Sequence, residues 1–106
     1  MSSVTGLVLV CSLIDGDQAV SSNIHELNSW LKRRGFGELV DVAQHSGGTK
    51  HHEMCMFCCG YNNFPEDNFA EIAVSMNWMD PESVVLIMQS HEGSTKMIRP
   101  GEFDCE

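Results

Sequence analysis

Residues 6–14 read GLVLVCSLI, and this segment decides the fold because its side chains are apolar on both alternating faces. Successive side chains of a strand point to opposite sides of a sheet, and only Ser12 interrupts the two apolar rows. A strand of this kind is typical of the centre of a sheet that is covered on both sides. We do not expect a signal peptide, because no basic residue precedes the run. Asp15-Gly16-Asp17 has the composition of a turn and is expected to end the strand.

Two helices are expected, and each has one apolar stripe at helical spacing. The first covers residues 23–34, where Asn23 and Glu26 have the spacing of a capping box. Gly35 follows it and can take the left-handed conformation that ends many helices. The second begins at Pro65, whose missing backbone N–H costs nothing in the first turn of a helix.

Four more segments have the composition of strands: residues 38–44, 50–59, 83–89 and 95–99. In the first of them, we expect Val40 and Val42 to face inward. The resulting order is β-α-β-β-α-β with an extra strand at the C-terminal edge. Crossover connections are right-handed, and we place the third strand between the first two. The sequence therefore predicts an α+β, ferredoxin-like split sandwich with sheet order 4-1-3-2 and both helices on one face.

The chain of 106 residues is expected to form one domain, with an ordered core at about 4–100 and a loose tail at 101–106. Its formal net charge of −9 comes from 15 acidic and 6 basic residues and argues against nucleic acid as a partner. No apolar run reaches the ~20 residues of a membrane span, so we also expect no membrane association. The expected compartment is the cytoplasm, because cysteines without a framework spacing indicate reduced thiols.

The acidic residues are unevenly distributed, since no lysine or arginine lies between Lys50 and Lys96. Glu66, Asp67 and Glu71 fall in that interval, at the start of the second expected helix. We interpret these three as candidate residues for binding a basic protein partner. The alternative is that the acidic excess only keeps the domain soluble.

The segment HHEMCMFCCG at residues 51–60 holds three of the cysteines. On a strand, Cys55 and Cys58 point in opposite directions, so they bind zinc together only if the chain turns there. A structural zinc site also needs a second pair of ligands, and a dithiol redox site needs this spacing at a helix N-terminus. We therefore expect buried strand thiols, with a zinc site and a redox site as alternatives.

Imidazole groups are expected to gather at one end of the sheet, where the first strand ends and the third begins. His45, His51 and His52 would lie there near Asp15, and these four residues are the candidate metal ligands. Such side chains suit a first-row metal ion or general acid–base chemistry. The alternative is that a sheet end rich in loops simply collects polar residues, since no ligand motif with a fixed spacing is present. No other cofactor is expected.

Two helices can cover one face of a four-stranded sheet but not both. Leaving about four outward apolar side chains in water would forfeit on the order of 6–12 kcal/mol, which is comparable to the net stability of a domain. We therefore expect the second face to be covered by a second copy of the chain, a ligand or another protein. A symmetric homodimer is the commonest arrangement.

The expected topology resembles that of the dimeric α+β barrels, which include cofactor-free oxygenases and small-molecule binders. This resemblance rests on the arrangement of the elements and carries over no catalytic residue. It implies an apolar cavity between two sheets. The candidate ligand-binding residues are Met54, Cys55, Met56 and Phe57.

The sequence contains no glycine-rich phosphate loop, nucleophile elbow or HExxH pattern. We therefore expect a non-enzymatic, acidic binding or regulatory protein that is dimeric through the helix-free face of its sheet. One alternative is a small-molecule-binding protein or small cofactor-free enzyme of the dimeric barrel type. Another is a protein that binds a metal ion through histidine and aspartate.

Overall fold

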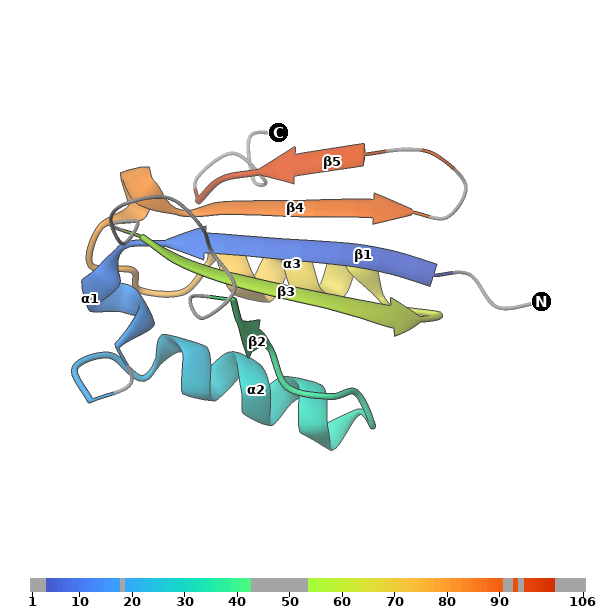
Figure 1. Ribbon diagram of the computed structural model, residues 1–106, viewed down its shortest axis with the longest axis horizontal. Helices are drawn as coiled ribbons and strands as arrows, with labels where there is room; N and C mark the ends of the chain where they lie inside the picture. Colours follow the sequence, from blue (N-terminus) through green and yellow to red (C-terminus); the bar gives the residue numbers. More distant parts are fainter. Residues whose placement is uncertain (1–3, 18, 43–53, 91–92, 94, 101–106) are drawn as a thin grey trace.

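The computed structural model describes residues 4–17, 19–42, 54–90, 93 and 95–100, so the expected tail at 101–106 lies outside it. The elements are β1 (Val4–Cys11), α1 (Leu13–Gly16), α2 (Asn23–Arg33), β2 (Val40–Asp41), β3 (Cys55–Asn62), α3 (Glu66–Val74), the 3₁₀ turn η2 (Pro81–Ser83), β4 (Val85–Ser90) and β5 (Thr95–Ile98). In Figure 1, α3 lies behind the sheet and α2 runs along its lower side. The mixed α+β class is confirmed. In the described part of the chain, no helix has the length and apolar character that crossing a membrane requires.

The five strands form one sheet with the order β2-β3-β1-β4-β5, which is 5-4-1-3-2 when it is followed from the β5 edge. Every neighbouring pair is antiparallel, with β1 at the centre between β3 and β4. The sheet differs in detail from the predicted ferredoxin-like arrangement, because β2 has only two residues and the full order includes a fifth strand. This fifth strand, β5, lies at the edge beside β4, where the sequence predicts an extra C-terminal strand. An additional short helix, α1, follows β1 directly.

One face of the sheet carries the core of the protein. Leu9 is fully buried at its centre and lies opposite Phe57 on β3 and Leu86 on β4. The apolar stripes of α2 and α3 pack into the same cluster, so both helices cover the same side of the sheet. The buried helix residues of this cluster are Ile24, Leu27, Trp30, Leu31, Phe69, Ala70 and Ala73.

The end of β1 differs from the prediction, because the strand stops at Cys11 and not at Ile14. Ser12 accepts a hydrogen bond from the backbone N–H of Asp15 at 3.1 Å and caps the single turn α1. A capping serine offers the backbone a local partner in place of the neighbouring strand, so strand pairing ends there. Leu13 and Ile14 are each 52% exposed as a result.

The prediction for β2 is wrong in the length of the strand and in the face of the sheet on which Val40 lies. Within the described part of the predicted strand, residues 38–42, only Val40 and Asp41 pair as a strand. Val40 is 56% exposed because it lies opposite Cys58, away from the helices. The buried residue is Leu39, whose backbone N–H donates to the Asn28 side chain at 2.9 Å. Two neighbouring apolar residues do not define which face of a strand is buried, and here the pairing with β3 defines it.

The helix boundaries follow the predicted positions, with one change of cap. Ser22, and not Asn23, is the residue that precedes α2, and Asn23 is buried as the first helical residue. Gly35 has the predicted left-handed conformation, with a φ of 82°. α3 begins directly after Pro65, and β3 extends to Asn62, beyond its predicted end at residue 59.

A buried carboxylate joins α1 to the loop between α3 and η2. Asp15 has no exposed surface, and its two oxygens accept from the backbone N–H groups of Met79 at 2.9 Å and Asp80 at 3.0 Å. The Ser12 hydroxyl donates to the same carboxylate at 3.2 Å. Charge-assisted bonds of this kind offset the cost of burying a charge, and they fix the end of β1 against the residues that lead into β4.

We predict that Asp15→Asn lowers the free energy of unfolding by about 2–4 kcal/mol, because an amide group offers one acceptor where the carboxylate offers two. Urea denaturation followed by circular dichroism measures this change. Asp17→Asn is the matched control, because the Asp17 side chain accepts an exposed local bond from Ala19 N–H at 3.0 Å, and the loss of this bond should cost less than about 0.5 kcal/mol. Equal effects of the two substitutions would contradict the structural role of Asp15.

Candidate functional site

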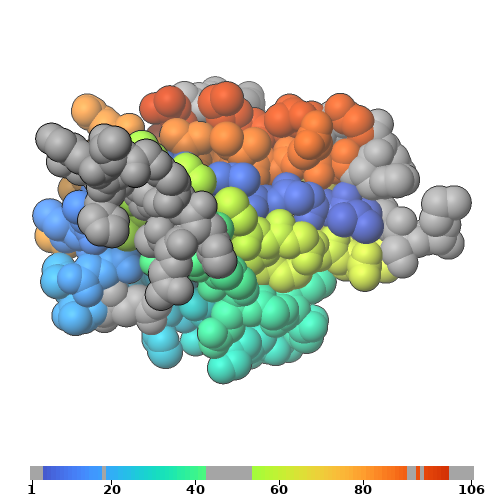
Figure 2. Space-filling model, viewed as in Figure 1, coloured from blue at the N-terminus to red at the C-terminus, as the bar shows by residue number. Residues whose placement is uncertain are grey.

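The helix-free face is the side of the sheet that points away from α2 and α3, and Figure 2 views the molecule from this side. Residues that lie opposite one another in an antiparallel pair point to the same side, so the register of the strands defines its members. The apolar members are Val4, Val8, Val10, Val40, Met56, Cys58, Val85, Ile87 and Met97. The other strand positions on this face hold Gly6, Gly60, Asn62, Gln89 and Thr95.

Charged side chains are missing from the helix-free face. Within the described strands, none of its positions holds aspartate, glutamate, lysine, arginine or histidine, although 20% of the chain is charged. Three of its apolar side chains are well exposed: Val4 at 44%, Val40 at 56% and Met97 at 62%. Figure 2 shows β3, β1, β4 and β5 side by side across this view. An uncharged apolar surface that spans several strands is typical of an interaction site.

The four residues predicted to line an apolar cavity are divided between the two sides of the sheet. Met56 lies on the helix-free face, and Met54 directly precedes β3 and is 41% exposed. Phe57 is 3% exposed and packs with the helices, and Cys55 points to the same side. Cys58 lies on the helix-free face, so Cys55 and Cys58 point in opposite directions, as predicted.

The structure describes one of the four predicted metal ligands. Asp15 is buried, and backbone N–H groups donate to both of its carboxylate oxygens. His45, His51 and His52 lie outside the described residues. Among the residues that the structure does describe, no group of three or more histidine, cysteine, aspartate or glutamate side chains is arranged to hold a metal ion. The metal site therefore stays a prediction.

The three acidic residues predicted to bind a partner all lie on α3, but they differ in exposure. The Glu66 side chain is 17% exposed, and its carboxylate accepts from the Thr5 hydroxyl at 2.5 Å and pairs with Lys96 at 3.1 Å. The Asp67 side chain is 82% exposed and lies 3.4 Å from the same lysine, and Glu71 is exposed. Glu66 therefore ties α3 to β1 and β5, whereas Asp67 and Glu71 face the solvent.

The surroundings of Glu66 favour its charged form. The hydrogen bond from Thr5 holds the pKa of the Glu66 carboxyl below its ordinary value, burial opposes this shift, and Lys96 supports it. The hydrogen bond between Lys96 and Glu66 in turn raises the pKa of the Lys96 ammonium group. At neutral pH, Glu66 is therefore a fixed structural anion and not a proton donor.

Two thiols lie together at the end of the sheet that carries α1. Cys11 on β1 is fully buried and lies directly opposite Cys55 on β3. Burial, followed by the neighbouring Cys55 and the carboxylates of Asp15 and Asp41, raises the pKa of Cys11 to about 12. Burial, followed by Asp41 and Asp17, also raises the pKa of Cys55. Both thiols are protonated at neutral pH, which is the opposite of an activated nucleophile.

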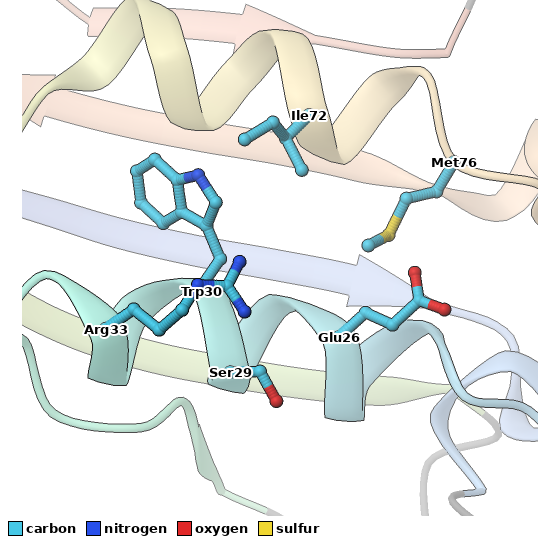
Figure 3. Close-up of a pocket in the computed structure, with 6 residues that line it drawn as sticks. All are labelled: Glu26, Ser29, Trp30, Arg33, Ile72 and Met76. Atoms are coloured by element: carbon cyan, nitrogen blue, oxygen red, sulfur yellow. The ribbon is translucent and has the colours of Figure 1, made fainter.

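A groove of about 400 Å³ separates α2 from α3 (Figure 3). It is lined by Glu26, Ser29, Trp30, Arg33, Ile72 and Met76. The indole N–H of Trp30 is buried and has no acceptor among the described residues, and its nitrogen lies on the side of the ring toward Ile72. Because this nitrogen has almost no exposed surface, a ligand in the groove could not reach it unless the side chains that cover it moved. The sequence pattern places Trp30 in a buried stripe and gives no sign of the groove.

No protein-family model, no curated protein and no solved structure matches this chain.

We predict that Thr5→Val lowers the free energy of unfolding by about 1–2 kcal/mol at neutral pH, because it removes a donor to a largely buried carboxylate. The folded-state pKa of Glu66 is lowered, so this contribution is present above the ordinary value of 4.5 and is lost as the pH falls through the folded value. Urea titrations at neutral and at acid pH measure the difference.

Thr95→Val is the control for this experiment, because Thr95 is exposed on the helix-free face and its hydroxyl should contribute less than about 0.5 kcal/mol. A Thr5→Val effect that stays the same from neutral to acid pH would contradict the coupling between Thr5 and the ionised Glu66.

Proposed function

We propose that this chain is a non-enzymatic binding or regulatory protein that acts as a symmetric homodimer. Each subunit would have a ferredoxin-like fold, and the helix-free face would form the interface. The observation that carries the proposal is the absence of charged side chains from that face in the described strands. The chain has a net charge of −9, and burying charged groups costs more free energy than burying uncharged ones. The uncharged face is therefore the part of the surface that is removed from water at the lowest cost.

The apolar side chains on this face favour burial over exposure. Val4, Val40 and Met97 are 44%, 56% and 62% exposed in the single subunit. Complete burial of a side chain of this size contributes about 1.5–3 kcal/mol, and roughly half of that remains available at these positions. In a symmetric interface both subunits bury these same side chains, so the contributions count twice. The favourable free energy of burial then reaches several kcal/mol before the entropic cost of association is subtracted.

The dimensions of the sheet fit a small interface. The 28 strand residues, at about 3.3 Å each in strands about 4.8 Å apart, give a flat area of roughly 450 Å². A standard interface uses about 800 Å² of accessible surface from each partner, and side chains raise the accessible area above the flat area. We therefore expect a dimer of moderate affinity whose population depends on protein concentration.

A second binding surface would stay free in this dimer. α3 lies behind the sheet in Figure 1, on the side opposite the helix-free face, and its Asp67 and Glu71 are exposed. We infer that these two residues contact a basic protein partner, while Glu66 holds α3 in position. Two copies of this acidic surface in one dimer would favour a partner with repeated basic sites.

The alternative function is binding of a small apolar molecule, or a cofactor-free reaction, between the two sheets. Met56, Cys58 and Met97 favour it, because all three bring polarisable sulfur-bearing side chains to the helix-free face.

We predict that the wild-type chain dimerises reversibly and that Ile87→Lys weakens dimerisation by more than about tenfold, because it places a charge in the interface. Ile87 lies opposite both Val8 on β1 and Met97 on β5. Sedimentation velocity over a range of concentrations measures the association. Met79→Lys is the matched control, because Met79 is 63% exposed and lies outside the helix-free face.

A wild-type chain that sediments as a monomer at every soluble concentration would refute this dimer. An Ile87→Lys variant that remains folded by circular dichroism and dimerises as well as Met79→Lys would refute the helix-free face as its interface.

For the acidic surface, we predict that Glu71→Gln weakens binding of a lysine-rich peptide by about two- to fivefold, the effect of one exposed ion pair. Fluorescence anisotropy at low ionic strength measures the dissociation constant, and added salt should raise it. Glu82→Gln is the matched control, since it removes the same charge from an exposed position on η2. Equal effects of the two substitutions would mean that only net charge matters.

A further inference from the structure

We propose that Cys11 and Cys55 form a reversible disulfide, which makes the α1 end of the sheet a redox modification site. The two residues lie directly opposite each other in the antiparallel pairing of β1 with β3, and both are free thiols in this structure. Their side chains therefore point to the same side of the sheet, toward the helices. This side is opposite the helix-free face, so the inference does not depend on the proposed dimer.

The spacing of the two thiols suits a disulfide. Opposite residues in antiparallel strands have Cα atoms about 4.5 or 5.5 Å apart, and both values fall within the ~4.4–6.8 Å found across disulfides. Gly16 supports this independently, because a Cβ at that position would overlap the Sγ of Cys55 and lie 3.5 Å from the Sγ of Cys11. Both sulfur atoms therefore lie around one point in space, against the end of α1.

The bond formed at this position would be easily reduced. Cβ atoms of opposite strand residues are about 4.5–5.5 Å apart, whereas a relaxed disulfide needs about 3.5–4.5 Å. Closure therefore strains the two strands, and strained disulfides have higher reduction potentials than relaxed structural ones. This property distinguishes a reversible modification from a permanent crosslink.

Neither of the other two β3 cysteines can replace Cys55. Cys58 points to the helix-free face. Cys59 points toward the helices, but it is four residues further along β3, which is about 13 Å on a strand. Joining either of them to Cys11 would break the register of β1 with β3.

The oxidant that we propose is a low-molecular-weight disulfide. Cys55, which is half-buried, loses its proton and attacks one sulfur of the small disulfide, forming a mixed disulfide and releasing one small thiolate. Cys11 then loses its proton and attacks the Cys55 sulfur, forming the Cys11–Cys55 bond and releasing the second small thiolate. The protein loses two electrons and two protons, and the two released thiolates take up the protons.

The exchange should be slow at neutral pH and faster in alkaline solution. Only the thiolate reacts, and burial raises the pKa of both cysteines. The carboxylates that face them and add to this effect are those of Asp15, Asp17 and Asp41. The site would therefore respond to sustained oxidising conditions.

The test uses the full chain, fully reduced and then incubated with glutathione disulfide at mildly alkaline pH. The remaining thiols are alkylated, and intact mass and peptide mapping identify the bond. We expect three alkylated cysteines where the reduced chain has five, a Cys11–Cys55 linkage, and complete reversal by a dithiol reductant.

Cys58→Ser and Cys105→Ser are the matched controls and should close as the wild type does. Cys11→Ala should stop at the glutathione adduct of Cys55. If Cys11→Ala does not fold, Cys55→Ala is used instead and should form no bond between Cys11 and another cysteine. A different linkage, closure that survives removal of Cys11 or Cys55, or no bond after prolonged incubation would overturn the proposal.

Discussion

The antiparallel pairing of β1 with both β3 and β4 is the constraint on which this structure depends. It gives β1 two rows of side chains with different surroundings: Leu7, Leu9 and Cys11 beneath the helices, and Val8 and Val10 on the helix-free face. The helices cover only the first row, and the second lies on the helix-free face, where we propose the dimer interface. The core, the proposed interface and the thiol pair all derive from this one register.

How much of the fold can be predicted depends on the range of the interactions. Alternation within residues 6–14 is a local property and correctly predicts a strand with two apolar faces. The end of that strand is predicted wrongly, because Ser12 suits a strand or a helix cap until its bond to Asp15 is known. Val40 is predicted wrongly for a similar reason, since its direction is defined only by pairing with Cys58.

In the candidate site, too, features that depend on one segment are predictable from the sequence, and features that depend on contacts between distant segments are not. The uneven charge predicts an acidic α3, but only the fold shows that Lys96 pairs with Glu66 and so removes it from the free surface. The opposite directions of Cys55 and Cys58 follow from alternation within one strand. The pairing of Cys55 with Cys11 does not, because it depends on which residues of two distant segments lie opposite each other.

Lys96 protects the outer edge of the sheet. It lies on β5, beyond which the described sheet has no further strand, and its ammonium group is held by Glu66 and Asp67 on α3. A strand that adds beside β5 would meet this group of charges, and charge at an edge strand is a common defence against lateral addition. Growth into cross-β fibrils is thereby disfavoured, whereas association face to face is complete with two copies. The proposed dimer would therefore form through the helix-free face without lateral addition of strands at β5.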